Sequence, residues 1–306
     1  MCVFLVALAL AVYRVAAEMM FAGAARTHAR TPRLLSKHLP RDRLHTDNVE
    51  RHRVLEVHHR GRFRSDATLH TYLRAPAERG NAKRPVVLVM YLHGNAGTID
   101  SYWQDVCDRL YNHLQHQPSR WRWAVGTFDY RRFGRSSSVR FPTPTLTVQD
   151  AHAVLLKHMH ACGAESFVLY GRSLGGAVAT HLAACTDHRA AGIFLETPFL
   201  GTHNVHVPAS TMAPNLFACA QQLRSLSDLG VPVHSAHAFN DKVVDTERNC
   251  ELLQRTGHDE IRVFAGKHTH NSLFMSPEWQ QALAVWLRSC GKYLSMLAVQ
   301  AAPQPL

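Results

Sequence analysis

The stretch Ser166-Phe-Val-Leu-Tyr-Gly-Arg-Ser-Leu-Gly175 decides the fold of this chain. Its first five residues form a short apolar run typical of a buried strand, and Leu174 to Ala184 have the small, apolar composition of a packed helix. Between them, Gly171 to Gly175 match the pattern G-x-S-x-G, in which a strand turns sharply into a helix and places the serine, here Ser173, at a strained corner. Chance alone produces this pattern in about one chain of this length in ten. The flanking strand and helix therefore carry the prediction against an ordinary strand-to-helix turn.

The rest of the chain alternates short β-branched runs with longer helical patterns, which predicts parallel βαβ units. The expected strands cover residues 85–92, 123–128, 166–170, 191–195, 231–236 and 261–264. The expected helices cover residues 100–115, 147–161, 174–185, 246–256 and 277–297. Residues 197–230 fit the alternation poorly and predict a small cap. The expected fold class is α/β, with a mostly parallel central sheet, helices on both faces and a short cap, in one domain over residues 51–300.

The composition is that of a soluble globular protein. Of the 306 residues, 46% are hydrophobic and 19% are charged, which excludes disorder for most of the chain. The seven cysteines are scattered without C-x-x-C spacing, so they indicate neither a disulfide framework nor a zinc site. The 22 histidines are likewise not grouped at the spacing of metal ligands. We expect no metal site.

The N-terminus predicts membrane association. Residues 2–13 are all apolar, so residues 1–25 are interpreted as a hydrophobic signal or anchor segment, with a packed N-terminal helix as the alternative. A basic connector follows at residues 26–50, and residues 26–65 hold eleven Lys or Arg against four Asp or Glu. This charge suits an anionic membrane surface. Nucleic acid is a weaker interpretation, because Phe63 is the only aromatic residue there that could stack on bases.

A serine hydroxyl needs a base to take its proton and an acid to orient that base. In strand-turn-helix proteins of this kind, acid and base follow the serine along the chain, on loops at the carboxyl ends of later strands. Asp241 comes just after the expected strand 231–236 and is the preferred acid. Asp245 is interpreted as the cap of the next helix, and Glu196 follows an earlier strand.

Two histidines follow the expected strand 261–264, namely His268 and His270. Spacing alone does not separate them. His270 is favoured because it lies nearer the final helix, which is expected to begin with Ser276 as its cap and Pro277 at its first position.

Backbone N–H groups that stabilise an oxyanion are expected at two places. His93-Gly-Asn-Ala-Gly97 follows the strand that ends at Leu92, so the N–H groups of Asn95 and Leu174 form the predicted oxyanion pair. A phosphate-binding loop is the rival interpretation of residues 93–97. The segment lacks the glycine and lysine spacing of a P-loop.

These residues stand in six blocks that resemble, in order, those of the membrane-anchored α/β-hydrolases, a family that includes monoacylglycerol and lysophosphatidylserine lipases and microbial relatives. The blocks begin at Tyr91, Phe128, Gly171, Glu196, His237 and His270. The resemblance spans about residues 85 to 290. It places Ser173, Asp241 and His270 at the family's triad positions and favours His270 over His268. The chain departs from the family at Arg132, where a small residue is usual, at Asp245, where proline is common, and in its short cap.

The resemblance implies a serine hydrolase that cleaves esters of single-chain lipids, such as monoacylglycerol or lysophospholipid, without metal or organic cofactor. It also implies a membrane location, with the endoplasmic reticulum or secretory pathway as candidates. Two alternatives remain open on the residues. The same triad serves acyl-protein thioesterases and serine peptidases, and a non-catalytic binding or scaffold protein can keep the fold.

Overall fold

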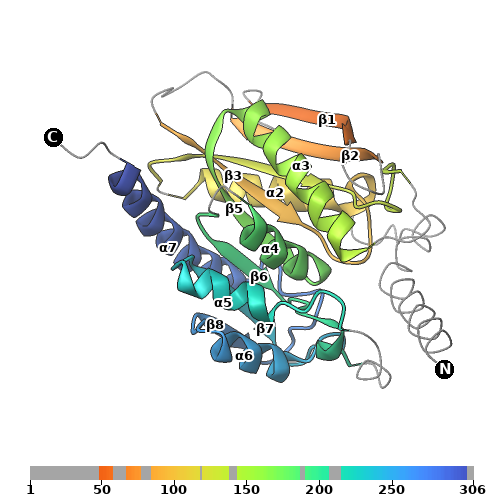
Figure 1. Cartoon of the computed structure of the whole chain (residues 1–306), viewed down its shortest axis with the longest axis vertical. Coiled ribbons are helices and arrows are strands. Elements are labelled where there is room, and N and C mark those ends of the chain that lie inside the picture. Colours follow the sequence, from red (N-terminus) through yellow and green to blue (C-terminus); the bar gives the residue numbers. More distant parts are fainter. Residues whose placement is uncertain are drawn as a thin grey trace, which may run out of the picture. The chain divides into compact units, whose positions relative to one another are not determined.

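The computed structural model describes residues 48–57, 67–76, 84–117, 119–137, 143–186, 190–206 and 215–301. These residues, drawn in Figure 1, divide into two compact units by their contacts. Of the described residues, the elbow unit contains 90–94 and those from 166 onward, and the N-terminal unit contains those from 48 to 89 and from 95 to 165.

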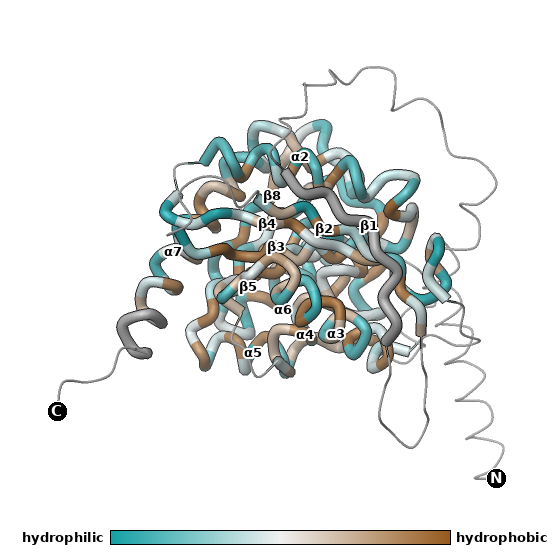
Figure 2. The backbone as a smooth tube through the Cα atoms, turned by 90° about the horizontal axis from the view of Figure 1, so that it is seen from above, coloured by the Kyte–Doolittle hydropathy of each residue, from teal (hydrophilic) through white to brown (hydrophobic). Residues whose placement is uncertain are grey.

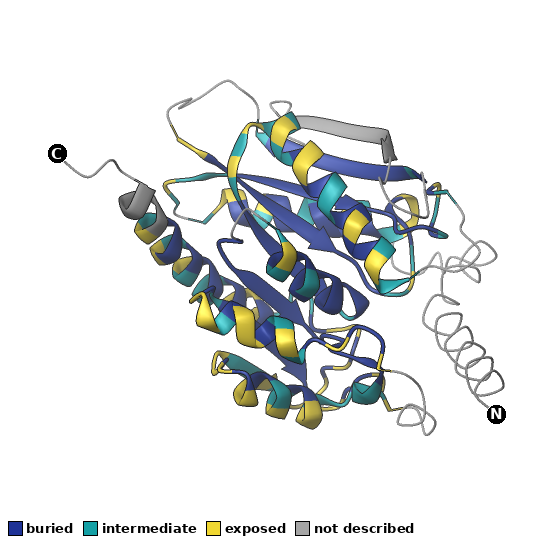
Figure 3. Ribbon diagram, in the orientation of Figure 1, coloured by how far each residue is buried: buried dark blue, intermediate teal, exposed yellow. Residues whose placement is uncertain are grey.

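The elbow unit is built on four parallel strands. They are β5 (Ala164–Arg172), β6 (Ile193–Glu196), β7 (Val233–Ala238) and β8 (Ile261–Phe264), hydrogen-bonded in that order. Leu169 pairs with Ile193, and Ile193 pairs with Val233. All residues of β6 and β7 are buried (Figure 3), as expected for parallel strands covered on both faces.

Helices cover both faces of this sheet. Phe194 in β6 packs against Trp286 in α7 (Pro277–Ala301), and the next residue, Leu195, lies against Gly176 in α4 (Leu174–Cys185). Since neighbouring residues in a strand point to opposite faces, α4 and α7 lie on opposite sides. The helices α5 (Ala220–Asp228) and α6 (Thr246–Arg255) continue the α4 side, because α5 contacts both α4 and α6. The helices carry hydrophobic and hydrophilic stretches together, as amphipathic helices do (Figure 2).

The N-terminal unit combines antiparallel strands with helices. Strand β1 (Asn48–Val57) pairs antiparallel with β2 (Ala67–Pro76), and β2 pairs antiparallel with β4 (Arg122–Phe128). Strand β3 (Val86–Leu92) follows β4 in the strand order. The helices are a π-helical turn η1 (Ile99–Trp103), α2 (Gln104–Gln115) and α3 (Pro144–Cys162). The ends of α3 are set by Thr143, whose side chain caps the first turn, and by Gly163, which ends the helix at φ 63°.

The predicted strands and helices are all present. Among the described residues, four further elements were not predicted, namely β1, β2, the 3₁₀ helix η2 (Thr202–Asn204) and α5. Strand β2 has no continuous apolar run because the polar residues His70, Thr71 and Arg74 interrupt it. These three residues are nevertheless buried. Arg74 is accommodated by Asp108 in α2, whose carboxylate accepts a hydrogen bond from the Arg74 guanidinium at 2.8 Å. Tertiary pairing therefore allows a polar sequence to form a buried strand.

The predicted cap and N-terminal segments are only partly within the described residues. In the predicted cap, residues 202–204 form a short 3₁₀ helix and residues 220–228 form α5, while residues 207–214 lie outside the described chain. The predicted signal or anchor segment lies outside it too, as does the connector up to residue 47. Within the part of the chain that the structure describes, no helix has the length and apolar character needed to cross a bilayer.

Candidate active site

Ser173 occupies a strained corner between β5 and α4. Its backbone has φ 50° and ψ −120°, a conformation that L residues rarely adopt. The glycines of the motif permit the close packing around it. A Cβ on Gly171 would lie 2.4 Å from the carbonyl oxygen of Gly175, and a Cβ on Gly175 would lie 1.8 Å from the carbonyl oxygen of Leu92. The pattern G-x-S-x-G is thus a steric requirement of this turn.

Three backbone hydrogen bonds hold this corner in place. The N–H of Ser173 donates to the carbonyl of Glu196 at 3.1 Å. The carbonyl of Ser173 accepts from the N–H groups of Gly176 and Phe199 at 2.8 and 2.9 Å. The strain is therefore opposed by contacts with the end of β6 and with the loop that follows it. The side chain of Ser173 stays partly exposed.

The side chains of Ser173, His270 and Asp241 form a continuous hydrogen-bonded chain. His270 Nε2 lies 2.9 Å from Ser173 Oγ, and His270 Nδ1 lies 2.8 Å from Asp241 Oδ2. Because an ionised carboxylate only accepts hydrogen bonds, the proton is placed on Nδ1, and Nε2 is the acceptor for the serine O–H. The structure thus brings together three residues that lie 29 to 97 positions apart in the chain.

Asp241 is held as an acceptor by its own loop. Its Oδ1 accepts from the backbone N–H groups of Val243 and Val244 at 2.8 and 3.0 Å. Burial acts to raise the pKa of Asp241, but the hydrogen bond and charge of His270 and these two N–H groups outweigh burial and lower the pKa. The carboxyl group is therefore ionised at neutral pH. Asp245 caps α6 through Arg248 N–H, as the sequence predicts.

The two candidate histidines, His268 and His270, make different contacts. His268 Nε2 lies 3.4 Å from the carboxylate of Glu278 at the start of α7, and its ring packs on Phe264. His270 is directed at Ser173. The choice between them therefore depends on the turn made by residues 268–272, which the spacing of the sequence does not reveal.

Of the predicted oxyanion pair, Leu174 is the first residue of α4. Its N–H is one of the four at a helix start that lack an intrahelical partner, and it follows Ser173 directly. Gly94 also lies close, because a Cβ there would be 3.4 Å from Ser173 Cβ. Asn95 belongs to the N-terminal unit, so its pairing with Leu174 stays a prediction.

The sequence profile of the α/β hydrolase fold matches residues 87–275, more than half of the chain. The chain belongs to the α/β hydrolase family.

Individual proteins are similar to this chain over most of its length. YfhR of Salmonella typhimurium is 25% identical over 215 residues, which are 65% of this chain and 69% of YfhR. Protein bem46 of Schizosaccharomyces pombe is 25% identical over 237 residues, 74% of each chain. Among solved structures, the esterase Pf2001 of Pyrococcus furiosus superposes with a TM-score of 0.55 at 14% identity, covering 78% of this chain and 90% of the esterase. That likeness shows the fold.

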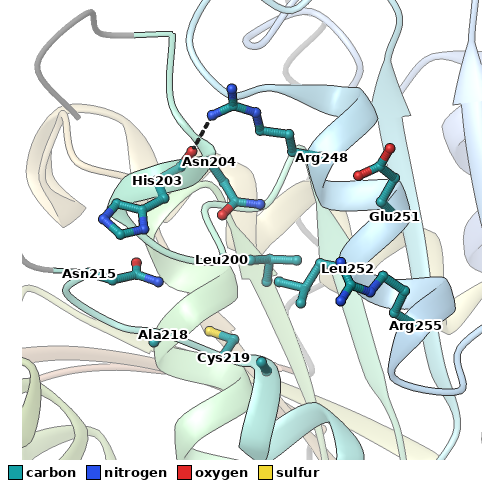
Figure 4. Close-up of a pocket in the computed structure, with 11 residues that line it drawn as sticks. Leu200, His203, Asn204, Asn215, Ala218, Cys219, Arg248, Glu251, Leu252 and Arg255 are labelled. Carbon is teal, nitrogen blue, oxygen red and sulfur yellow. Dashed lines mark hydrogen bonds between the residues drawn. The ribbon is translucent and has the colours of Figure 1, made fainter. Parts of the chain in front are cut away.

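A pocket of about 290 Å³ lies beside the α4 layer of this α/β hydrolase (Figure 4). The predicted cap forms one wall and α6 the other. Arg248 in α6 spans them by donating to the carbonyl of His203 at 2.9 Å. Leu200 follows Phe199, whose N–H bonds to Ser173, so the wall is joined to the corner by a short segment. The lining residues are Leu200, His203, Asn204, Asn215, Ala218, Cys219, Ala220, Arg248, Glu251, Leu252 and Arg255.

The sequence reasoning missed the polar residues that surround the three candidates. Arg172, Thr197 and Tyr170 are buried next to the histidine loop, and each is hydrogen-bonded. Arg172 occupies the variable position of G-x-S-x-G, which carries no chemical signal by itself. Among the described residues, no group of three His, Cys, Asp or Glu is placed to hold a metal ion.

Proposed function

We propose that this α/β hydrolase is a serine hydrolase that cleaves carboxylic esters through an acyl-enzyme. The observation that supports this most directly is the chain of two hydrogen bonds from Ser173 through His270 to Asp241, at 2.9 and 2.8 Å. A hydroxyl is a weak nucleophile, and an imidazole at this distance, oriented by a carboxylate, is the arrangement that activates it.

The reaction follows from these positions. His270 Nε2 takes the proton of Ser173 as Oγ attacks the ester carbonyl, and Oγ forms a bond to the carbonyl carbon. His270 then gives that proton to the departing alkoxide, and the acyl group remains on Ser173. Water, deprotonated by His270, attacks the acyl carbon; the bond to Ser173 Oγ breaks, Oγ takes the proton back from His270, and the carboxylic acid is released. Asp241 stabilises the imidazolium in both steps, since its low pKa keeps the carboxyl group ionised.

The negative charge that develops on the carbonyl oxygen is stabilised at the start of α4. The Leu174 N–H stands at the positive end of a twelve-residue helix. The N–H of Asn95 is proposed as the second donor. Removal of one such donor costs about 3 kcal/mol of transition-state stabilisation in other serine hydrolases.

Single-chain lipids are the proposed substrates. Phe239 and Val243 flank Asp241 in the loop after β7, and these residues are 67% and 47% exposed. Apolar side chains left in water beside a reactive group favour an apolar substrate or a lipid surface. The membrane association that we predict for residues 1–25 would bring the enzyme to such substrates.

Labelling with a fluorophosphonate tests the nucleophile. The wild type is expected to be labelled, and Ser173→Ala is expected to lose both labelling and ester hydrolysis. Ser235→Ala is a matched control, because Ser235 is a buried serine of the same unit whose hydroxyl has no hydrogen-bond partner among the described residues. Equal labelling of Ser173→Ala and wild type would refute the assignment.

A panel of substrates tests which class of bond the enzyme cleaves. Hydrolysis of long-chain monoacylglycerol and lysophospholipid is compared with that of short esters, acyl-cysteine thioesters and aminopeptidase substrates. We expect Phe239→Ser to lower kcat/KM for the long-chain esters by about 10-fold, because one exposed apolar contact is lost, and to leave short esters unchanged. A preference for thioesters or peptides over lipid esters would assign the triad to a different bond.

A further inference from the structure

A buried polar network links the strand before Ser173 to the loop that carries His270. Its central pair is Arg172 and Glu196, which are 4% and 0% exposed. Arg172 Nε lies 3.6 Å from Glu196 Oε1, close enough to pair the charges but beyond hydrogen-bond distance. The role of Arg172 is therefore inferred from the hydrogen bonds that its guanidinium donates to other groups.

Arg172 directs its guanidinium at the histidine loop. Its Nη2 donates to Asn271 Oδ1 at 3.0 Å and to the carbonyl of His270 at 3.4 Å. The hydroxyl of Thr197 donates to the same carbonyl at 3.3 Å. The backbone of His270 is thus held by two side chains, one immediately before Ser173 and the other immediately after Glu196.

Glu196 holds the other end of the same loop. Its carboxylate accepts a hydrogen bond from the backbone N–H of Phe274 and another from the hydroxyl of Tyr170. The Tyr170 oxygen in turn accepts from the indole N–H of Trp279 at 2.7 Å. Residues 270 to 274 are therefore attached to β5, β6 and α7.

We infer that Arg172 and Glu196 are positioning residues that set the distance between His270 Nε2 and Ser173 Oγ and balance the charge around the imidazole. The inference deepens the proposed function and rests on it. Arg172 precedes Ser173 in the chain and bonds to the His270 carbonyl, so it joins the backbone of the nucleophile to the backbone of the base. Among the side chains that the structure describes, removal of the guanidinium would leave the Thr197 hydroxyl as the one donor to that carbonyl.

The charges around His270 come from three strands. Asp241 follows β7 and bonds to Nδ1, Glu196 ends β6 and interacts with the ring through its charge, and Arg172 ends β5. His237 in β7 faces Asp241 and is buried. Loss of the positive charge of Arg172 leaves Glu196 unbalanced and favours the imidazolium. Loss of the negative charge of Glu196 has the opposite effect.

The test compares Arg172→Gln and Glu196→Gln with wild type by the pH dependence of kcat/KM on a short ester. Because the neutral imidazole is the base, we expect the acid limb to move to higher pH in Arg172→Gln and to lower pH in Glu196→Gln, by about one pH unit each. At its optimum, Arg172→Gln should have a kcat about 10- to 100-fold lower, because the base is no longer held at the nucleophile. Arg172→Lys should restore the limb but not the rate, since a lysine keeps the charge without the planar fork.

Two controls separate positioning from folding. Arg131→Gln removes a buried arginine of the N-terminal unit, and it should lower stability without moving the limb. A crystal structure of Arg172→Gln should show His270 Nε2 beyond hydrogen-bond distance from Ser173 Oγ, a result that needs no activity. An unmoved limb with kcat within twofold of wild type would overturn the inference. A wild type that neither hydrolyses esters nor takes up the label would overturn the proposed function, and the crystal structures would still decide the positioning role.

Discussion

Two buried arginines in this chain, Arg131 and Arg172, direct their hydrogen bonds to different kinds of partner. In the N-terminal unit, Arg131 Nε and Nη2 donate to the two oxygens of Asp150 in α3 at 2.6 and 2.8 Å, so one guanidinium binds both carboxylate oxygens. In the elbow unit, Arg172 stands 3.6 Å from Glu196 and gives hydrogen bonds to the histidine loop instead. Both arginines are almost fully buried.

Each region also contains residues other than glycine with positive φ, and one in each lies next to the buried arginine. Arg132 has φ 73° and Ser173 has φ 50°. At Arg132 the strained backbone closes a turn, with its N–H bonded to the carbonyl of Ser137. At Ser173 the strain presents a hydroxyl to a base. The Arg131–Asp150 pair beside a turn stabilises structure, whereas Arg172, beside the proposed nucleophile, gives its hydrogen bonds to the loop of the proposed base.

The largest effect of a substitution is expected at Asp241, the proposed acid. Asp241→Asn should lower kcat by about 10⁴-fold, because the amide no longer stabilises the imidazolium or selects the Nδ1–H tautomer. Ester hydrolysis and fluorophosphonate labelling measure it. Asp245→Asn is the control, since asparagine also caps a helix. Activity of Asp241→Asn within tenfold of wild type would move the acid role elsewhere.

Loss of the Arg131–Asp150 ion pair should lower the stability of the protein and leave its reaction rate unchanged. We expect Arg131→Gln to lower the free energy of unfolding by about 3–5 kcal/mol, because the buried carboxylate of Asp150 loses the two guanidinium hydrogen bonds that balance its charge. Urea denaturation measures the change. The double variant Arg131→Met with Asp150→Leu should recover most of it, since no charge then remains buried. A loss below about 1 kcal/mol in Arg131→Gln would contradict the structural role.

Acid should weaken the elbow unit through a buried histidine. Burial lowers the pKa of His237 to about 4, with the charge of Asp241 opposing the shift. The unfolded chain then binds this proton at a higher pH than the folded one, so stability falls as pH drops from about 6.5 to 4. The loss attributable to His237 is about 3 kcal/mol at pH 4. His237→Phe should show a smaller fall than wild type in urea denaturation across this window, while the exposed His160→Gln should behave as wild type.

The smallest expected effect concerns Arg132, where small residues are usual in the family that the chain resembles. The structure supplies the reason, because φ 73° is costly for any side chain with a Cβ. Arg132→Gly should raise the free energy of unfolding by about 1 kcal/mol. Arg132→Ala separates strain from loss of the guanidinium, since it keeps the strain. An equal gain in both variants would mean that strain is not the cause.

The sequence predicted the apolar elements well and the polar ones poorly. Strands such as β6 are continuous apolar runs because both faces are covered, and such runs are visible in a sequence. Strand β2 buries His70 and Arg74, and α5 lies within a segment interpreted as a cap. These elements depend on partners such as Asp108, which are distant in the chain. Local patterns do not report such partners.

The sequence by itself determined the strand-turn-helix around Ser173, since an apolar run and a helix of small residues flank the G-x-S-x-G pattern, and it determined the order in which candidate acid and base follow. Only the tertiary structure decided that His270 rather than His268 faces the serine, and that Arg172 reaches the histidine loop. The physical reason is directional. Periodicity reports which face of an element is apolar, whereas the direction of a side chain in a loop depends on hydrogen bonds to residues far away in the chain.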